Sequence, residues 1–247
     1  MKLISLNTWS GRGGKEILLD FFRRNKDIDI FCLQEVWEGG HHHAPLWGEG
    51  IDTTLVTNIS NILTGHSTFF RPHYMDWYGL AIYIKKDIKV QKEGDIFVFK
   101  ERENTFDDDK ALHHARNLQY MTIETSKGLK TIANFHGLWN AVHKEDSEER
   151  LMQSGNIVKF LKDISNPYIF CGDFNLLPET KSLKMLEDLG IRNLIKEFNV
   201  TSTRSSHYKK PVRFADYTLV SKDIKVNEFK ILPDEVSDHL AMYLDFE

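Results

Sequence analysis

Several features that mark other classes of protein are scarce in this sequence of 247 residues. It contains 2 cysteines and 6 prolines, and its 32 lysines and arginines do not outnumber its 36 aspartates and glutamates. So few cysteines argue against a disulfide-stapled scaffold. Cys32 and Cys171 each follow an Ile-Phe pair in an apolar run, and we expect both to be buried thiols. Without an excess of positive charge, any binding of DNA or RNA must be local.

Long apolar runs are also missing. No stretch approaches the roughly 20 apolar residues that a membrane-spanning helix needs, and the segment from Met1 to Asn7 turns polar too early for a signal-peptide core. We therefore expect a cytoplasmic monomer that makes no contact with a membrane. No Gly/Ser-rich or Pro-rich linker interrupts the chain, so we predict a single domain over residues 1–247.

Short apolar runs, by contrast, are abundant. Those with β-branched or aromatic residues predict strands at 2–8, 28–36, 66–74, 78–84, 88–99, 116–125, 129–137, 167–173, 213–221, 225–232 and 240–246. Helical spacing predicts helices around 17–22, 151–161 and 183–189. Because the strand-like runs between 66 and 137 have no helix between them, regular βαβ alternation is excluded. We predict an α+β fold, a four-layer α/β/β/α sandwich of two mixed, largely antiparallel sheets flanked by helices.

Polar side chains gather at the ends of the predicted strands: Asn7, Glu35, His136, Asp173, Asn175, Asp216, Asp238 and His239. Buried carboxylates are costly unless a cation meets them, and the oxygen ligands of Asp, Glu and Asn suit Mg²⁺ or Mn²⁺ better than Zn²⁺. Taken singly, each residue also has a structural explanation, as a turn residue, a solvated edge acid or a helix cap. Their joint order along the chain is what indicates an active site.

Two of these acids end similar phrases, at 30–35 and 169–173. Each phrase contains Ile-Phe-Cys and closes on a carboxylate. The likeness would suit two similar halves that place their acids at one sheet edge, although it is too short to establish a repeat.

Six short motifs occur in an order that resembles the endonuclease/exonuclease/phosphatase superfamily. They are Leu-Asn-Thr-Trp (6–9), Leu-Gln-Glu (33–35), Asn-Phe-His-Gly-Leu (134–138), Gly-Asp-Phe-Asn (172–175), Ala-Asp-Tyr (215–217) and Ser-Asp-His (237–239). The resemblance runs from residue 3 to residue 244. It implies a metal-dependent phosphoesterase with two stacked mixed sheets between helical layers, in agreement with the strands predicted above.

The resemblance also implies roles for individual residues. Glu35 would be the principal metal ligand, supported by Asn7 and Asp238, with Mg²⁺ as the cofactor and Mn²⁺ as an alternative. The metal would grip a non-bridging oxygen of the substrate phosphate. Charge neutralisation of this kind is what phosphoryl transfer needs most from a protein.

The second half of the implied site is catalytic. Asp173 would orient or deprotonate the attacking water, and Asn175 and His136 would donate hydrogen bonds to the phosphoryl oxygens. His239 would contact the same group as a cation, with Asp216 bonded to its other ring nitrogen to fix the ring and raise its pKa.

Candidate substrate-binding residues lie close to these motifs in the sequence. The segment 203–213 is basic and contains an aromatic residue; in it, Arg204 is a candidate phosphate clamp, although a solvated loop is an equal alternative. Arg116 opens a predicted strand, and Trp139 and Asn140 follow His136 so closely that we expect them to line the pocket. We expect the histidine pair at 113–114 in an exposed loop.

Three functions remain open from the sequence. The leading prediction is a nuclease or phosphodiesterase that cleaves DNA or RNA with Mg²⁺. A phosphatase or phosphodiesterase acting on a small molecule or a lipid head group is the alternative, because loops rather than the shared motifs choose the substrate. A catalytically dead binding module is disfavoured, since every matched position keeps the residue that the chemistry requires.

Overall fold

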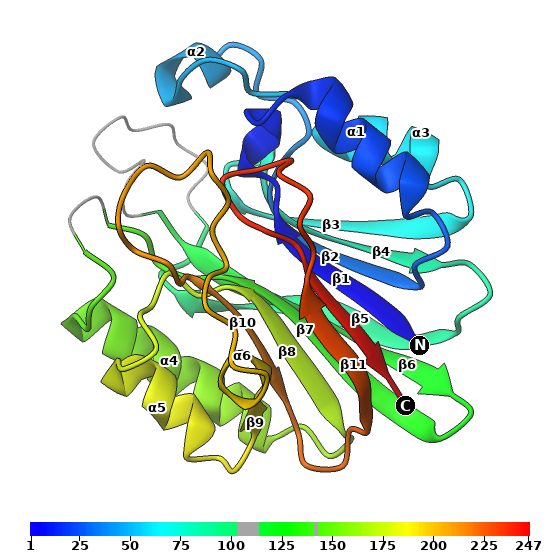
Figure 1. The fold of residues 1–247 in the computed structure, drawn as a ribbon, viewed down its shortest axis with the longest axis vertical. Coiled ribbons are helices and arrows are strands. Elements are labelled where there is room, and N and C mark those ends of the chain that lie inside the picture. Colours follow the sequence, from blue (N-terminus) through cyan, green and yellow to red (C-terminus); the bar gives the residue numbers. More distant parts are fainter. Residues whose placement is uncertain (103–113, 141–142) are drawn as a thin grey trace.

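A computed structural model describes residues 1–102, 114–140 and 143–247, and in it two six-stranded sheets pack face to face (Figure 1). In spatial order the first sheet contains β11 (Val226–Ile231), β12 (Met242–Phe246), β1 (Lys2–Asn7), β2 (Ile30–Trp37), β4 (Tyr78–Lys85) and β3 (His66–Tyr74). The second contains β5 (Val90–Phe99), β6 (Arg116–Thr125), β7 (Gly128–His136), β8 (Tyr168–Asp173), β10 (Asp216–Val220) and β9 (Arg192–Asn193). Only the β1–β2 and β7–β8 pairs among the described strands are parallel, so both sheets are mixed and largely antiparallel, as predicted.

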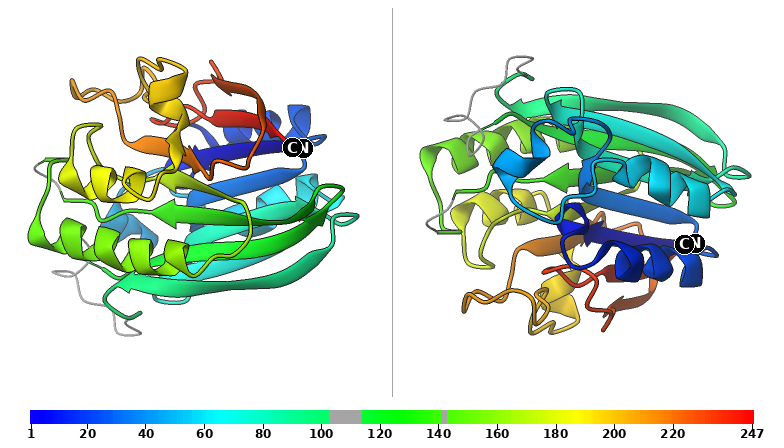
Figure 2. Two further views of the ribbon diagram at one scale, coloured as in Figure 1. Left: turned by 90° about the horizontal axis from the view of Figure 1, so that it is seen from below. Right: turned by 90° about the horizontal axis from the view of Figure 1, so that it is seen from above.

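Helices cover the outer face of each sheet (Figures 1 and 2). The first sheet carries α1 (Lys15–Arg24) and α3 (Leu55–Ile62), and the second carries α4 (Glu148–Lys162) and α5 (Lys181–Glu187). The short elements are η1 (Trp9–Gly11), α2 (Ala44–Trp47) and α6 (Leu194–Glu197). The predicted four-layer sandwich is therefore confirmed. The eleven predicted strands and the three predicted helices, α1, α4 and α5, are all present. The helices α2, α3 and α6 and the two-residue β9 were not predicted.

Alternation of side chains along β2 explains how one strand serves two layers. Ile30 and Cys32 belong to the core between the sheets, while Phe31 and Leu33 pack with α1 and α3 on the other face. Cys32 and Cys171 are buried free thiols, as expected from the sequence. In the described ranges, none of the helices is both long and apolar enough to cross a membrane.

The two parallel pairs carry chemical groups to one edge of the sandwich. Carboxyl ends of parallel strands meet at the same edge, so Asn7 comes to lie near the end of β2, and His136 pairs in register with Asp173. Asp216 opens β10 opposite Asp173, because β10 runs antiparallel to β8. The chain termini lie together away from this edge, where the Met1 amino group donates to the Phe246 carbonyl oxygen at 2.6 Å (Figure 2).

Gly172 allows β7 and β8 to approach closely just before the carboxyl end of β8. Its φ is +140°, and a Cβ at this position would lie 2.0 Å from the Phe135 carbonyl oxygen. We expect Gly172→Ala to lower the free energy of unfolding by about 3 kcal/mol, measured by urea denaturation. The matched control is Gly155→Ala in α4, where the new Cβ meets only Met185 at 3.8 Å and a gain of about 0.5–1 kcal/mol is expected. Equal stability of the two variants would contradict this account.

Candidate active site

A pocket of about 410 Å³ opens at the edge where the strands of the two parallel pairs, β1–β2 and β7–β8, end. Of the catalytic and metal-binding residues predicted from the sequence, six line it: Glu35, His136, Asp173, Asn175, Asp238 and His239. Asn7 and Asp216 lie behind them, hydrogen-bonded to lining residues. The structure thus brings all eight into one constellation, although they come from segments spread over the whole chain.

Two of these residues sit in an unusual backbone conformation. Glu35 has φ +55° and lies where the pairing of β2 with β4 shifts register, between Leu33 and Val36. Asn175 has φ +54°, and its N–H donates to Asp173 Oδ1 at 2.9 Å. Left-handed conformations are uncommon for residues other than glycine, and strain of this kind concentrates at functional sites. The bulge aims the Glu35 carboxylate into the pocket.

Asn7 links the two halves of the acid cluster. Its Nδ2 donates to Glu35 Oε1 at 3.0 Å and to Asp173 Oδ2 at 2.9 Å, while its Oδ1 accepts from the Trp9 N–H at 2.9 Å. The carboxamide nitrogen, and not the oxygen, therefore faces the acids. Ligation of a metal by Asn7, as predicted, would require the carboxamide to turn over and give up the hydrogen bond from Trp9.

The acids form a place where a hard cation fits. Burial raises the pKa of Glu35, and the carboxylates of Asp238 and Asp173 raise it further, against the hydrogen bond from Asn7. No Lys or Arg in the described ranges forms an ion pair with Glu35, and the imidazole Nε2 of His136 lies 3.7 Å from its Oε1. Ligand atoms of Glu35, His136 and Asp173 lie within 4.8 Å of one another. A divalent cation here would relieve the repulsion that the protein alone leaves.

His136 is a neutral donor in this environment. Burial lowers its pKa well below the ordinary value, and the positive charge of Arg116 lowers it further. Its Nδ1 is buried without a hydrogen-bond partner among the described residues, whereas its Nε2 lies 3.8 Å from Asp173 Oδ2. A single proton placed on Nε2 therefore faces the acids and any phosphoryl oxygen bound beside them.

His239 and Asp216 form the predicted pair. Nδ1 of His239 lies 2.8 and 2.9 Å from the two carboxylate oxygens of Asp216, and Thr203 Oγ1 also donates to Asp216 at 2.8 Å. Burial and the Arg204 guanidinium lower the pKa of His239, but the carboxylates of Asp216, Asp238 and Asp173 outweigh them and the pKa is raised. The ring is thus held in place and disposed to carry a proton.

Arg204 bridges the acids and the histidine. Its Nη1 donates to Asp238 Oδ2 at 3.0 Å and contacts His239 Nε2, while its Nε is buried with no partner in the described part of the chain. The guanidinium also stacks on Tyr208, 4.1 Å from the ring centroid. A hydrogen bond from Arg204 to Nε2 requires a neutral imidazole, so protonation of His239 would break it. An anion between the two groups would accept from both.

Arg116 is held by a hydrogen-bond relay that begins at a carboxylate. Asp95 accepts from Asn117 Nδ2 at 2.9 Å, Asn117 Oδ1 lies 3.1 Å from His73 Nδ1, and His73 Nε2 lies 3.1 Å from Arg116 Nη1. Arg116 also contacts His114, which is buried and lines the pocket, so the expectation of an exposed loop at His114 was wrong. His113 lies outside the described residues. The guanidinium of Arg116 is buried and pairs with no carboxylate in the part of the chain that the structure describes.

The two other predicted substrate-binding residues differ in position. Trp139 lines the pocket and is 37% exposed, so its indole is open to a bound molecule. Asn140 is not among the described lining residues, and its Oδ1 instead accepts from the His143 N–H at 2.9 Å within the loop.

Six lining residues carry no prediction from sequence: Trp9, Arg12, Leu46, Trp47, Tyr78 and Lys144. Tyr208 and Lys210, which also line the pocket, belong to the predicted basic segment 203–213. The hydroxyl of Tyr78 stays protonated, because burial and then the charge of Glu35 raise its pKa well above the ordinary value. Lys144 donates to Asn175 Oδ1 at 2.5 Å and is only 8% exposed. Aromatic and cationic side chains thus surround the acids.

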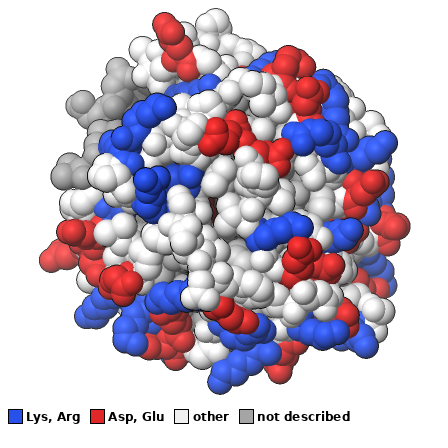
Figure 3. Space-filling model, viewed as in Figure 1, with Lys and Arg blue, Asp and Glu red and all other residues white. Residues whose placement is uncertain are grey.

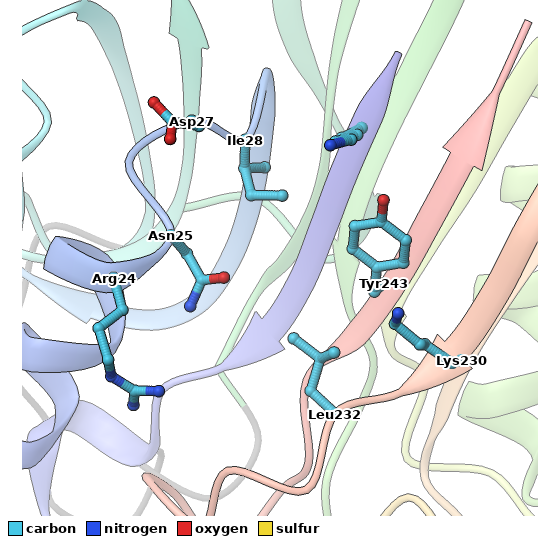
Figure 4. Close-up of a pocket in the computed structure, with 8 residues that line it drawn as sticks. Arg24, Asn25, Asp27, Ile28, Lys230, Leu232 and Tyr243 are labelled. Atoms are coloured by element: carbon cyan, nitrogen blue, oxygen red, sulfur yellow. The ribbon is translucent and has the colours of Figure 1, made fainter.

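A second depression lies far from this chemistry, between the α1–β2 turn and strands β11 and β12 (Figure 4). Its volume is about 290 Å³, and the side chains around it include Arg24, Asn25, Asp27 and Tyr243. Its described lining holds one carboxylate and no histidine, so it offers no comparable reactive cluster.

Comparison with known proteins agrees with this geometry. The sequence model of the Endonuclease/Exonuclease/phosphatase family matches residues 4–239. No curated protein matches the chain. A mannosyl-6-phosphatase of Bacteroides thetaiotaomicron VPI-5482 has a similar structure, with 15% identity, a TM-score of 0.76, and coverage of 100% of this chain and 99% of that chain.

Two further solved structures share the fold. The human Nocturnin catalytic domain with a bound sulfate anion has 20% identity and a TM-score of 0.70, covering 100% of this chain and 93% of that chain. A humanized D. rerio TDP2 has 16% identity and a TM-score of 0.66, covering 100% and 98%. At these identities the likeness establishes the fold and leaves the substrate open.

Proposed function

The chain belongs to the endonuclease/exonuclease/phosphatase family, and we propose that it hydrolyses phosphoesters with the help of Mg²⁺, or of Mn²⁺ in its place. One observation carries the proposal. Asp173 Oδ2 lies 2.9 Å from Asn7 Nδ2, 3.5 Å from His239 Nε2 and 3.8 Å from His136 Nε2, beside Glu35. A single carboxylate oxygen is thus central to a cluster that has both acids for a metal and donors for a phosphate.

Glu35 and Asp238 are the residues that would hold the cation. Asn7 would keep Glu35 and Asp173 in their relative positions. When bound, the cation supplies Lewis-acid polarisation of the phosphoryl group and neutralises charge that builds up on its oxygens. Glu35 has no Lys or Arg partner in the described ranges, whereas Asp238 shares its charge with Arg204 at 3.0 Å.

Asp173 is the group that would orient and deprotonate water. Burial alone would raise its pKa, but His239 and Lys144 outweigh burial and the pKa is lowered, so the carboxylate stays ionised. His136 would donate its Nε2 proton to a phosphoryl oxygen, and Asn175 would donate an amide N–H. His239, held by Asp216, would add a positive charge to the same group.

Two substrate classes remain under this proposal. The strip at 203–213 favours nucleic acid, since Arg204, Tyr208 and Lys210 from it line the pocket. A compact phosphoester is favoured by the pocket itself, whose volume suits a small molecule and whose walls come from several separate segments. On the face shown in Figure 3, charges of both signs alternate and basic residues form no continuous strip, so duplex binding has little support there. The geometry therefore favours the compact substrate.

Removal of the metal is the first test. Treatment with EDTA should abolish hydrolysis of p-nitrophenyl phosphate, bis(p-nitrophenyl) phosphate and end-labelled oligonucleotides, whichever of them the protein accepts, and added Mg²⁺ should restore it. Cutting of oligonucleotides with Mg²⁺ would establish the nuclease. Intact oligonucleotides with turnover of a small ester would establish the compact class. Turnover that is equal in EDTA and in Mg²⁺ would contradict the proposed mechanism, and no turnover of any ester would support a binding module.

A further inference from the structure

Lys144 is a buried cation that lies near the carboxylates of Asp173, Asp216 and Asp238 without pairing with any of them. It is 8% exposed and lines the pocket, and its ammonium donates to Asn175 Oδ1 at 2.5 Å. No ion pair joins it to an acid within the residues that the structure describes. Burying an ammonium without a counter-ion is costly, so a lysine in this setting indicates an anionic ligand.

Several hydrogen bonds fix the position of the loop that carries this lysine. Arg150 in α4 is buried, and its guanidinium donates to the carbonyl oxygens of Leu138 at 3.3 Å and His143 at 2.9 Å, and also to Glu145. The Lys144 carbonyl oxygen accepts from the Leu177 N–H at 3.1 Å. The loop that carries Lys144 is therefore fixed from both sides, which is typical of a positioned functional group.

The contact with Asn175 also determines the direction of its carboxamide. With Oδ1 occupied by Lys144, Nδ2 donates to the Gly137 carbonyl oxygen at 3.3 Å and keeps its second N–H for the pocket. An ammonium has three donors, so Lys144 retains two after this bond. Both groups can then donate to the same phosphate.

The charges around the pocket indicate how negative that phosphate should be. Among the described residues that line the pocket, Lys and Arg number five and Asp and Glu number three. Once a divalent cation neutralises Glu35 and Asp238, the fixed positive charges exceed Asp173 by a wide margin. A phosphomonoester carries about two negative charges at neutral pH, because its second pKa is about 6, whereas a diester carries one. This excess of positive charge favours the dianionic monoester over the monoanionic diester.

Resting on the phosphoesterase activity proposed above, we propose that Lys144 binds the extra charge of a terminal phosphate and makes this site selective for phosphomonoesters. In a monoester, Lys144 donates to a non-bridging phosphate oxygen. In a diester, the corresponding oxygen is esterified and carries no negative charge. Through Asn175 it also acts as a positioning residue. The bond to phosphorus breaks in the same way for both ester classes, so selectivity arises from charge recognition.

The test compares two esters with the same leaving group. Wild-type protein with Mg²⁺ should have the higher kcat/KM for p-nitrophenyl phosphate, the monoester, than for bis(p-nitrophenyl) phosphate, the diester. Lys144→Met should lower the monoester value about 100-fold and the diester value about tenfold or less, and Lys144→Arg should keep most of the wild-type ratio. Lys184→Met, at an exposed position in α5, is the control and should change neither.

A second readout is the affinity for a product-like anion. Inorganic phosphate, which is also dianionic at a pH of about 7.5, should inhibit the wild type competitively, and Lys144→Met should raise its inhibition constant at least about tenfold. Burial lowers the pKa of Lys144 to about 8, and the charge of Arg204 acts in the same direction. The carboxylates of Asp173, Asp216 and Asp238 oppose this shift. Monoester kcat/KM should therefore fall above this pH in the wild type, and this limb should disappear in Lys144→Arg.

The outcomes separate this inference from the proposed function. If both esters are hydrolysed and Lys144→Met leaves their ratio and phosphate inhibition unchanged, the selectivity role of Lys144 is overturned while the hydrolase stands. A wild type that prefers the diester would overturn it as well. If neither ester nor any oligonucleotide is hydrolysed with Mg²⁺, the proposed function itself is wrong.

Discussion

Asp173→Asn should lower kcat by about 10³- to 10⁴-fold and change KM little, because the variant keeps a group of the same shape but cannot accept the proton of water. The role requires an ionised carboxylate. Against the opposing effect of burial, the pKa of Asp173 is lowered by His239 and Lys144, which keeps the carboxylate ionised. Steady-state kinetics on whichever phosphoester is turned over, with Mg²⁺ in excess, measures the effect.

The fold should survive this substitution. The carboxamide introduced at position 173 can still accept from the Asn175 N–H through its one oxygen, as Asp173 Oδ1 does at 2.9 Å. Asp223→Asn, at an exposed residue in the turn before β11, is the matched control and should leave kcat unchanged. Circular dichroism and a thermal scan would show that the protein is folded. A folded Asp173→Asn variant with more than about a tenth of wild-type kcat would rule out Asp173 as the base.

Alternating and helical apolar patterns were sufficient for most of the fold, and α3 shows where they fail. The sequence of α3, Leu55–Ile62, is rich in β-branched residues and asparagine, which have low helix propensity. Its N-cap residue, Thr54, makes no side-chain capping bond. The helix forms because Leu55 and Ile59 are buried against the first sheet. Such packing is a tertiary effect that local sequence does not encode.

The candidate site likewise has one part that the sequence predicts and another that depends on tertiary contacts. Its acids and histidines lie at the ends of regular strands, where short motifs mark them in order, so sequence alone predicts the constellation. Lys144 stands in the charged stretch His143-Lys144-Glu145-Asp146, which has the composition of a solvated loop. The guanidinium of Arg150, reaching back from α4, folds that loop into the pocket. The orientation of Asn7 likewise depends on the Trp9 N–H and could not be inferred from a motif.

Glu35→Gln should remove activity and yet stabilise the metal-free protein. The pKa of Glu35 is raised in the fold, first by burial and then by the carboxylates of Asp238 and Asp173. The folded protein therefore binds this proton more readily than the unfolded chain does. The contribution of Glu35 to stability consequently falls as the pH rises from the ordinary glutamate range through the raised pKa. At neutral pH in EDTA, the neutral glutamine avoids that repulsion.

Thermal unfolding of wild type and Glu35→Gln, each in EDTA and in excess Mg²⁺, measures both parts of this prediction. In EDTA the variant should have the higher Tm, by about 2–4 °C for each kcal/mol of repulsion removed. Mg²⁺ should raise the Tm of the wild type, since a cation at about 100 times its Kd stabilises by about 2.7 kcal/mol, and should leave the variant unchanged.

Glu179→Gln, at an exposed acid before α5, should behave as the wild type does in both conditions. A Glu35→Gln protein that is less stable in EDTA, or that still responds to Mg²⁺, would show that Glu35 is structural and that the cation is held elsewhere. A gain in stability coupled to loss of the metal response would mean that the protein keeps a destabilising carboxylate at φ +55° because the cation requires it.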